Sequence, residues 1–283
     1  MDSSKLTPFL TVRDHSVSGE DFELLKDQAL DMLVTFPKPE GAYLARYYES
    51  EDYISHTDAK RSLFEKAYHI VKSRALRKKV KLINSFGPKG IILDIGAGTG
   101  DFLITAKNEG WNVLGIEPNA KARETASKKG VPFAENDDSL NDSAFDVISM
   151  WHVLEHVPDV KKQIATLSRL IKPNGTVLIA VPNFNSYDAK YYGSFWAAYD
   201  VPRHLTHFSK TAIKTLFEAH EFRLEKILPM KYDAFYVSLL SEKYKTGRMN
   251  FVKAFMTGLR SNWNGRRNME YSSHIYVLKS TKK

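Results

Sequence analysis

Residues 91–100 (IILDIGAGTG) join an apolar run to alternating glycines, a pattern typical of a strand that brings its backbone against a ligand. The apolar run predicts a buried parallel strand, and the helical apolar spacing of residues 101–107 predicts a helix directly after the glycines. The N-terminal amides of that helix would face whatever the glycines hold. The chemistry expected here is therefore the binding of a polar cofactor by main-chain groups.

The residues that flank the glycines discriminate between cofactors. A dinucleotide fingerprint requires Gly or Ala three residues after its second glycine, and that position holds Asp101. We expect this carboxylate to repel a pyrophosphate, which argues against NAD. A second strand is predicted over residues 111–116, and Glu117 behind it is well placed to accept hydrogen bonds from both hydroxyls of a ribose. An adenosyl group without a diphosphate meets both conditions.

The segments 94–100 (DIGAGTG) and 115–118 (GIEP) resemble the cofactor half of class I S-adenosylmethionine (SAM) methyltransferases. Residues 145–157 resemble the fourth strand and following helix of that family, and residues 170–183 resemble its turn and fifth strand. The resemblance implies a SAM-dependent methyltransferase (EC 2.1.1.-). It also implies that the glycine loop, the acid after the second strand and the end of the fourth strand bind the cofactor. The residues concerned are Asp94, Gly96, Ala97, Gly98, Gly100, Glu117, Pro118, Met150 and Trp151.

Strands alternate with helices from residue 91 to residue 182, which predicts an α/β fold with a doubly wound, mostly parallel sheet. The family resemblance implies a Rossmann-like sheet of seven strands with a reversed last strand. We expect a helix over 58–86, another over 209–220, and two closing strands over 224–228 and 273–279. Two further helices, 232–244 and 250–259, are expected to cap the substrate side. The methyltransferase domain then spans residues 58–283, with substrate-side insertions at about 184–208 and 230–270.

Residues 1–57 have an irregular pattern and are interpreted as an N-terminal accessory segment. Some bacterial methyltransferases begin with a small zinc ribbon, in which paired cysteines precede a Thr-x-Pro-x-Pro turn similar to residues 35–39. The matching positions here hold Asp27 and Leu30. This resemblance implies a degenerate, metal-free piece that packing alone must hold together.

The composition of the chain limits the kinds of binding partner that we expect. The formal charge is +8, and basic residues concentrate at 66–81 and 260–267. We favour a solvated helix face over a nucleic-acid patch, although an anionic partner stays open. The absence of cysteine excludes disulfides, thiolate metal sites and a cysteine nucleophile. No apolar stretch approaches ~20 residues and the N-terminus does not have the layout of a signal peptide, so we expect a cytoplasmic protein without a membrane span.

His152, Glu155 and His156 match H-x-x-E-H, the signature of inverted zinc peptidases. A peptidase needs this motif inside a helix, whereas here it follows a predicted strand directly. We therefore expect no metal. In this interpretation His152 faces the pocket, and the Glu155-His156 pair orients the turn.

Residues 195–209 (FWAAYDVPRHLTHFS) follow the fifth predicted strand, where an open α/β sheet receives its substrate. They resemble an Asp-x-Pro-Arg-His-Leu-x-His-Phe-Ser element of a methyltransferase subfamily, and more distantly a Glu-His-x-x-Tyr-Phe-Ser element of sugar C-methyltransferases. That match implies that His204 is the base, and Arg203 stands where the glutamate would be. The predicted catalytic residues are His204, His152, His207 and Arg203, and the predicted substrate-binding residues are Tyr53, His56, Trp196 and Tyr199, with a helix-capping role open for His207.

Methyl transfer requires an acceptor held in line with the sulfonium carbon, and a hydroxyl or carbon acceptor must also lose a proton to a base. The aromatic and histidine-rich loop favours a small acceptor such as a sugar, a quinone or a phenol, methylated on O, C or N, with Arg203 suited to an anionic substituent. Ser149 to His152 replace the Asn/Asp-Pro-Pro-aromatic tetrad of DNA amino-methylases, which disfavours that class. The alternatives are a SAM-binding protein without catalysis, a basic nucleic-acid-binding protein and, third, an NAD oxidoreductase.

Overall fold

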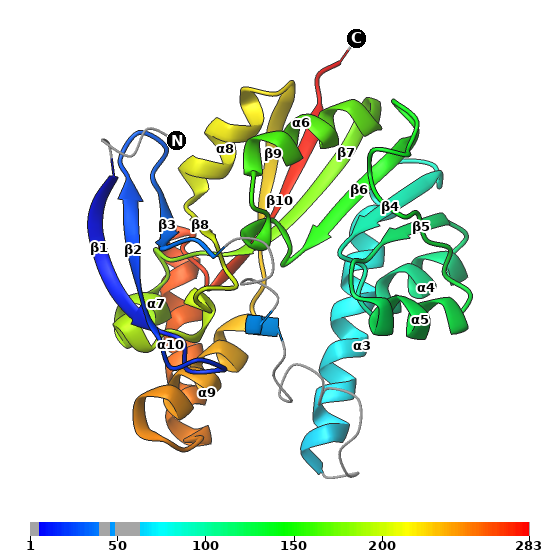
Figure 1. The fold of residues 1–283 in the computed structure, drawn as a ribbon. Coiled ribbons are helices and arrows are strands. Elements are labelled where there is room, and N and C mark those ends of the chain that lie inside the picture. The colour runs from blue at the N-terminus through cyan, green and yellow to red at the C-terminus, as the bar shows by residue number, and fades with distance from the viewer. Residues whose placement is uncertain (1–5, 40–45, 49–62, 283) are drawn as a thin grey trace.

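The chain is described here by a computed structural model that covers residues 6–39, 46–48 and 63–282. At its centre lies a six-stranded mixed sheet, so the predicted α/β fold is confirmed (Figure 1). Its first four strands are parallel, and the strand that is last in the chain runs antiparallel to both of its neighbours, as predicted. In spatial order the strands are β5 (Asn112–Ile116), β4 (Ile91–Ile95), β6 (Phe145–Trp151), β7 (Ile171–Pro182), β10 (Ser273–Ser280) and β9 (Phe222–Pro229).

The seventh strand that we predicted is reduced to a single bridge between Phe133 and Gly115 in the described part of the chain. The main chain on either side still pairs with β5, because Gly115 N donates to Pro132 O and Ala134 N donates to Gly115 O. Pro132 has no N–H and cannot donate to a ladder, which limits the pairing of this segment. The prediction of a full seventh strand is therefore wrong, whereas the order of the other six strands is unaffected.

Two groups of helices cover the two faces of the central sheet (Figure 1). Successive side chains of a strand point to opposite faces. Ile92 and Val147 accordingly belong to the core beneath α3 and α4, whereas Leu93 and Ile148 belong to the core beneath α6 and α8. Three helices that we predicted by range are confirmed, namely α3 (Leu63–Ile83), α4 (Asp101–Asn108) and α8 (Lys210–Glu218). The predicted alternation of strands and helices is filled by α5 (Ala120–Lys128) and α6 (Val160–Leu170).

The N-terminal segment is more regular than we predicted. It forms three antiparallel strands, β1 (Leu6–Arg13), β2 (Asp21–Asp27) and β3 (Met32–Phe36), which pair with β8 (Thr206–Phe208) in a second sheet of order β1-β2-β3-β8. At the β2–β3 turn the Asp27 carboxylate accepts hydrogen bonds from Ala29 N (2.9 Å) and Leu30 N (3.1 Å). A carboxylate thus closes the turn at one of the positions that matched a zinc-ribbon cysteine.

Helices form in the segments that we predicted to cap the substrate side. They are α7 (Tyr187–Tyr192), α9 (Asp233–Thr246) and α10 (Phe251–Asn268), and the segment between α7 and β8 contains two short 3-10 helices. The N-terminal sheet packs on this layer, since Phe22 and Leu24 share an apolar core with Tyr192 and Trp196. α10 extends nine residues beyond the end that we predicted, Leu259, because the small residues in its second half lie on its buried face.

The turn between β4 and α4 yields a stability prediction. Gly100 and Gly98 both have positive φ, at 74° and 53°, but only at Gly100 would a Cβ meet another side chain, at 2.7 Å from Ala126 Cβ. The strained backbone should cost about 1 kcal/mol in either Ala variant, and overpacking should add about 1–3 kcal/mol in Gly100→Ala alone. Urea unfolding should therefore show the larger loss for Gly100→Ala, and equal losses in the two variants would contradict the proposed packing.

Candidate functional site

The glycine loop after β4 is anchored to the end of β5. Gly96 N and Ala97 N both donate to Ile116 O, at 2.8 and 3.1 Å. Gly100 caps the N-terminus of α4 in the left-handed conformation and contributes no side-chain hydrogen bond to the first helical amides. The loop therefore presents main-chain groups at the carboxyl edge of the sheet, next to a helix N-terminus, where an open α/β sheet binds its ligands.

Glu117, directly after β5, points back toward the glycine loop. Its carboxylate accepts hydrogen bonds from Gly98 N and Asn119 N, each at 2.8 Å. Arg123 of α5 fixes the turn by donating to Glu117 O at 2.6 Å, and Pro118 is exposed beside it. Loop and carboxylate thus come together at the ends of adjacent parallel strands, as the sequence predicts.

Asp94 lies below the loop, inside β4. It is buried, and Ser149 Oγ of the neighbouring strand β6 donates to its Oδ1 at 2.6 Å. Burial raises the pKa of Asp94 to about 7, although the hydrogen bond from Ser149 and the charge of Lys79 oppose this shift. Asp94 can therefore bear or lack a proton close to neutral pH.

The end of β6 presents Trp151 to the α3 and α4 side of the sheet and Met150 to the opposite side. The ammonium of Lys79 on α3 lies 4.0 Å from the centroid of the Trp151 ring, and Phe102 meets the same indole edge-on. The Trp151 indole nitrogen is buried without a hydrogen-bond partner in the described structure, and burial lowers the pKa of Lys79 to about 8. The Met150 side chain is fully buried in the other core, so only its main chain can flank a cofactor.

Asp101, whose charge argued against NAD, does not act as an isolated anion. Its carboxylate pairs with Lys72 and Lys129, each at 2.6 Å. Burial alone would raise the pKa of Asp101, but the hydrogen bonds and charges of these two lysines lower it. Because two cations flank the carboxylate, our repulsion argument loses its force.

His152 follows β6 in the left-handed conformation, with φ at 57°. Its imidazole bridges two carboxylates, with Nδ1 at 3.3 Å from Glu155 and Nε2 at 3.1 Å from Asp233 of α9. Burial alone would lower the pKa of His152, but hydrogen bonds and charges from Asp233 and Glu155 raise it to about 10. His152 is therefore a cation at neutral pH, and this geometry disfavours the basic role that we predicted for it.

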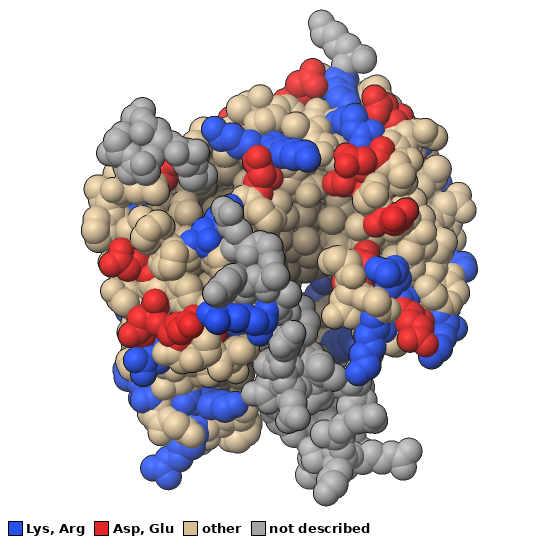
Figure 2. Space-filling view, in the orientation of Figure 1, with Lys and Arg blue, Asp and Glu red and all other residues tan. Residues whose placement is uncertain are grey.

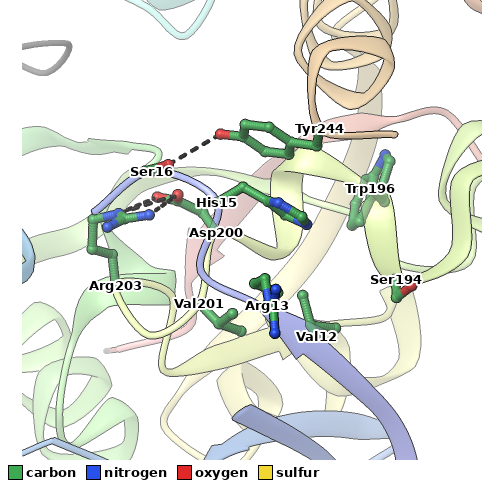
Figure 3. Close-up of a pocket in the computed structure, with 10 residues that line it drawn as sticks. All are labelled: Val12, Arg13, His15, Ser16, Ser194, Trp196, Asp200, Val201, Arg203 and Tyr244. Carbon is green, nitrogen blue, oxygen red and sulfur yellow. Dashed lines mark hydrogen bonds and ion pairs between the residues drawn. The ribbon is translucent and has the colours of Figure 1, made fainter. Parts of the chain in front are cut away.

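Arg203 is buried at the junction between the N-terminal sheet and the loop that precedes β8 (Figure 3). Its guanidinium donates to the carboxylates of Asp14 (3.2 Å) and Asp200 (2.6 Å) and to Tyr47 O (3.0 Å). Burial alone would lower its pKa, but the two carboxylates raise it. These contacts occupy the donors of Arg203, so the structure favours a structural role over the catalytic or anion-binding role that we predicted.

A cavity of about 200 Å³, part of it open to solvent, lies beside this junction, between the β1–β2 turn and residues 194–203 (Figure 3). Ligand pockets usually enclose ~300–1,000 Å³. The cavity is also lined by His15 and Tyr244, whose rings stack with centroids 4.7 Å apart. We interpret it as a packing gap at the junction and not as the cofactor site.

His204 and His207 lie in the same segment but have different surroundings. His204 Nδ1 lies 2.9 Å from Ala198 O, and its Nε2 lies 3.9 Å from the Asp200 carboxylate. His207 is buried next to Thr35 Oγ1 of β3 (3.2 Å), and burial lowers its pKa to about 3. His207 therefore joins β8 to the N-terminal sheet, which is a structural position.

His204 also lies close to the turn after β6. Ligand atoms of Glu155, His156 and His204 lie within 4.8 Å of one another, so these three residues could hold a metal ion, although we expected none. Glu155 and His156 belong to a short 3-10 helix (Leu154–His156), so H-x-x-E-H does not have the α-helical geometry of a peptidase. Burial lowers the pKa of His156 to about 4.

The predicted substrate-binding residues separate into two groups. Trp196 and Tyr199 are buried in the core beneath the N-terminal sheet, where the Trp196 indole donates to Asp188 at 2.8 Å. Their aromatic rings therefore serve packing, a role that an aromatic cluster in the sequence does not distinguish from substrate binding. Tyr53 and His56 lie outside the described residues.

Sequence reasoning did not identify Lys79 and Asp233 as site residues. Lys79 belongs to the basic stretch that we interpreted as a solvated helix face, and Asp233 belongs to a helix predicted only as a cap. The only sign of their role is that each places a charge where a helix packs against the sheet. That position can be recognised only when the orientation of the helix is known.

Comparison with known proteins adds to this geometry. A family model described as a methyltransferase domain matches residues 67–227. The ubiquinone biosynthesis O-methyltransferase of Cronobacter sakazakii is 34% identical over 111 residues, which are 36% of this chain and 45% of the relative. The protein of the same name from Sodalis glossinidius is 34% identical over 104 residues, which are 33% and 42% of the two chains. The chain thus matches less than half the length of these curated relatives.

Two solved structures share the fold. One is a geranyl diphosphate C-methyltransferase from Streptomyces coelicolor, in complex with Mg²⁺, geranyl diphosphate and S-adenosyl-L-homocysteine. Its TM-score is 0.54 and its sequence identity is 14%, and the match covers 80% of this chain and 88% of that one. The other is a SAM-dependent methyltransferase from Archaeoglobus fulgidus, with a TM-score of 0.53 and 21% identity over 77% and 98% of the two chains.

The His152 bridge yields a prediction about pH. The folded protein holds a proton on His152 that the unfolded chain releases above pH 6.5. The resulting stabilisation is complete below pH 6.5 and disappears as the pH rises through about 10. Asp233→Asn should move the NMR titration midpoint of His152 downward and should destabilise the fold most on the acidic side of this range. The exposed control Asp138→Asn should change neither property, and an unshifted midpoint in Asp233→Asn would rule out the bridge.

Proposed function

Because this chain belongs to the family of SAM-dependent methyltransferases, we propose that it transfers a methyl group from SAM to a small-molecule acceptor. The observation that carries this proposal is the convergence of the glycine loop and Glu117, 2.8 Å apart, at the ends of β4 and β5. When bound, SAM supplies an electrophilic methyl carbon that the acceptor attacks in line. The protein must hold the acceptor in position and remove its proton.

We infer that main-chain groups of the Gly96–Gly100 loop hold the methionine moiety and that Glu117 accepts hydrogen bonds from the ribose hydroxyls. The unpartnered Trp151 indole nitrogen supports a polar ligand at the end of β6. Lys79, 4.0 Å from the Trp151 ring centroid, supplies a positive charge suited to the carboxylate of the methionine moiety. These residues fit the cofactor because they offer donors, acceptors and a cation at one edge of the sheet.

We propose His204 as the base. Its Nδ1 faces the carbonyl oxygen of Ala198, which can only accept, so Nδ1 carries a proton and the lone pair of the neutral ring would lie on Nε2. His204 Nε2 can therefore take the acceptor proton, and Asp200 at 3.9 Å would stabilise the resulting cation. His152 is less suited to this role because its two carboxylate partners keep it protonated.

This arrangement favours an acceptor whose nucleophile carries an acidic proton, such as a phenol or an enol. The curated relatives are O-methyltransferases by name, which supports a hydroxyl acceptor for this chain. A C-methyltransferase shares the fold, so a carbon acceptor is the second candidate. Arg203 pairs with Asp14 and Asp200 and does not offer its charge to an anionic substituent of the acceptor.

Replacing Glu117 tests the cofactor site. Glu117→Ala should weaken SAM binding in calorimetry by roughly 10- to 100-fold, since hydrogen bonds to a charged group contribute ~1.5–3 kcal/mol. The matched control is Glu124→Ala on α5, because Glu124 is exposed and pairs only with Lys128 in the described structure. Undiminished affinity in Glu117→Ala would contradict the proposed cofactor site.

Replacing His204 tests the base. In His204→Asn the side-chain amide can still donate to Ala198 O, but the Nε2 lone pair is lost. Methyl transfer from radiolabelled SAM into a metabolite extract should fall at least ~10-fold, while SAM affinity stays nearly unchanged. His220→Asn is the control, because this histidine lies in the turn after α8 and its side chain bonds only Leu216 O in the described structure. Full turnover in His204→Asn would remove His204 from the mechanism, and preferential labelling of nucleic acid would overturn the acceptor class.

A further inference from the structure

Helix α10 has small residues on its buried side and large apolar residues on its exposed side, the opposite of an ordinary surface helix. The side that faces the protein consists of small residues, and Gly258 and Gly265 would each place a Cβ within 2.7 Å of an aromatic ring of Phe235 or Tyr271. Ser261 on the same side donates to the buried Asp188 of α7 at 2.5 Å. Close approach of the helix backbone, and not burial of large apolar side chains, therefore attaches α10 to the molecule. Its buried residues are Ala254, Thr257, Gly258, Ser261 and Gly265.

The outer side of α10 carries large apolar side chains. Val252, Met256, Leu259 and Trp263 follow the i, i+4, i+7, i+11 spacing that places residues on one face of a helix. Val252 is 77% exposed and Trp263 is 53% exposed. We call these four residues, together with the adjacent and exposed Phe255, the apolar stripe. An ordinary surface helix turns such residues inward, so the apolar stripe indicates a partner that is itself apolar.

The chain around the apolar stripe is basic, with one of its cations, Lys253, paired to the buried Glu242 of α9 at 3.4 Å. Residues 243–269 contain seven Lys or Arg and no Asp or Glu. Figure 2 shows Lys and Arg at the lower left of the molecule, near the place that α9 and the following loop occupy in Figure 1, whereas basic and acidic side chains are interspersed over much of the remaining face. The basic residues of this surface are Lys243, Lys245, Arg248, Lys253, Arg260, Arg266 and Arg267.

We propose that α10 docks on an anionic membrane surface. The apolar stripe would enter the boundary between headgroups and acyl chains, and the flanking cations would contact lipid phosphates, as amphipathic interfacial helices do. A second copy of this chain fits less well, because a symmetric contact through α10 would bring two surfaces of the same charge together. No helix in the described part of the chain is long and apolar enough to cross a membrane.

Helix α9 connects α10 to the candidate functional site. α10 packs along α9 (Figure 1), and Asp233 at the start of α9 pairs with His152 at the end of β6. A membrane at α10 would therefore lie beside the helical cap over the carboxyl edge of the sheet. The inference does not depend on the identity of the methyl acceptor.

Flotation of the full-length protein with vesicles tests the proposal. Vesicles of equal parts phosphatidylcholine and phosphatidylglycerol should bind the protein at least ~10-fold more strongly than vesicles of phosphatidylcholine alone, and added salt should weaken the binding. Val252→Ser with Leu259→Ser, and separately Arg260→Gln with Arg266→Gln, should each lower the partition coefficient roughly tenfold or more. The matched controls are Val17→Ser, at an exposed valine on the β1–β2 turn, and Lys121→Gln with Lys161→Gln, at exposed lysines away from α10.

Each outcome decides the proposal. Binding that the α10 variants weaken and the controls leave unchanged supports it. Absence of binding to the anionic vesicles overturns it, and so does equal binding by the α10 variants and the wild type. A concentration-dependent dimer in sedimentation that the serine variants abolish, together with no vesicle binding, would assign the apolar stripe to a second copy. SAM affinity should be unchanged in all of these variants, so failure here is distinguishable from failure of the proposed methyl transfer.

Discussion

The buried guanidinium of Arg203 joins the parts of the molecule on which the proposed site depends. It links Asp14 at the β1–β2 turn and Tyr47 O to Asp200 in the segment before β8. His204, the proposed base, is the residue directly after Arg203. The ion cluster around Arg203 therefore fixes the backbone of His204. Breaking a buried ion pair by removing one partner costs about 3–5 kcal/mol, because the other charge remains buried and unpaired. A charge network thus adds to the β3–β8 pairing and the shared apolar core as a link between the N-terminal sheet and the rest of the chain.

Two histidines near the end of β6 have opposite characters because their partners differ. His152 lies between the carboxylates of Glu155 and Asp233 and holds its proton. His204 faces a carbonyl oxygen with one nitrogen and leaves the lone pair of the other available. The first arrangement holds α9 against the sheet by charge, whereas the second is the one that we propose for proton transfer. The difference between the two histidines follows from environment, since both side chains have the same chemistry.

The sequence predicts the central sheet well because its strands are short apolar runs and its turns contain glycine. The loop at 96–100 and Glu117 are predicted correctly as neighbours, since the carboxyl ends of parallel strands meet at one edge. The sequence does not predict β1, because Pro8 and the irregular register between Pro8 and Leu10 interrupt its alternation. Local periodicity does not encode how distant elements pack. For this reason the sequence does not predict the burial of Met150 and Trp196 or the pairing of Asp233 with His152.

The three residues of β8 pair with β3 on one side, and Phe208 also bridges Asn183 at the end of β7. The strand is thus shared by the N-terminal sheet and the edge of the central one. Local opening of either sheet at this point exposes amides of the other, which couples their fluctuations. Amide hydrogen exchange around Thr206 to Phe208 would therefore be sensitive to the opening of either sheet.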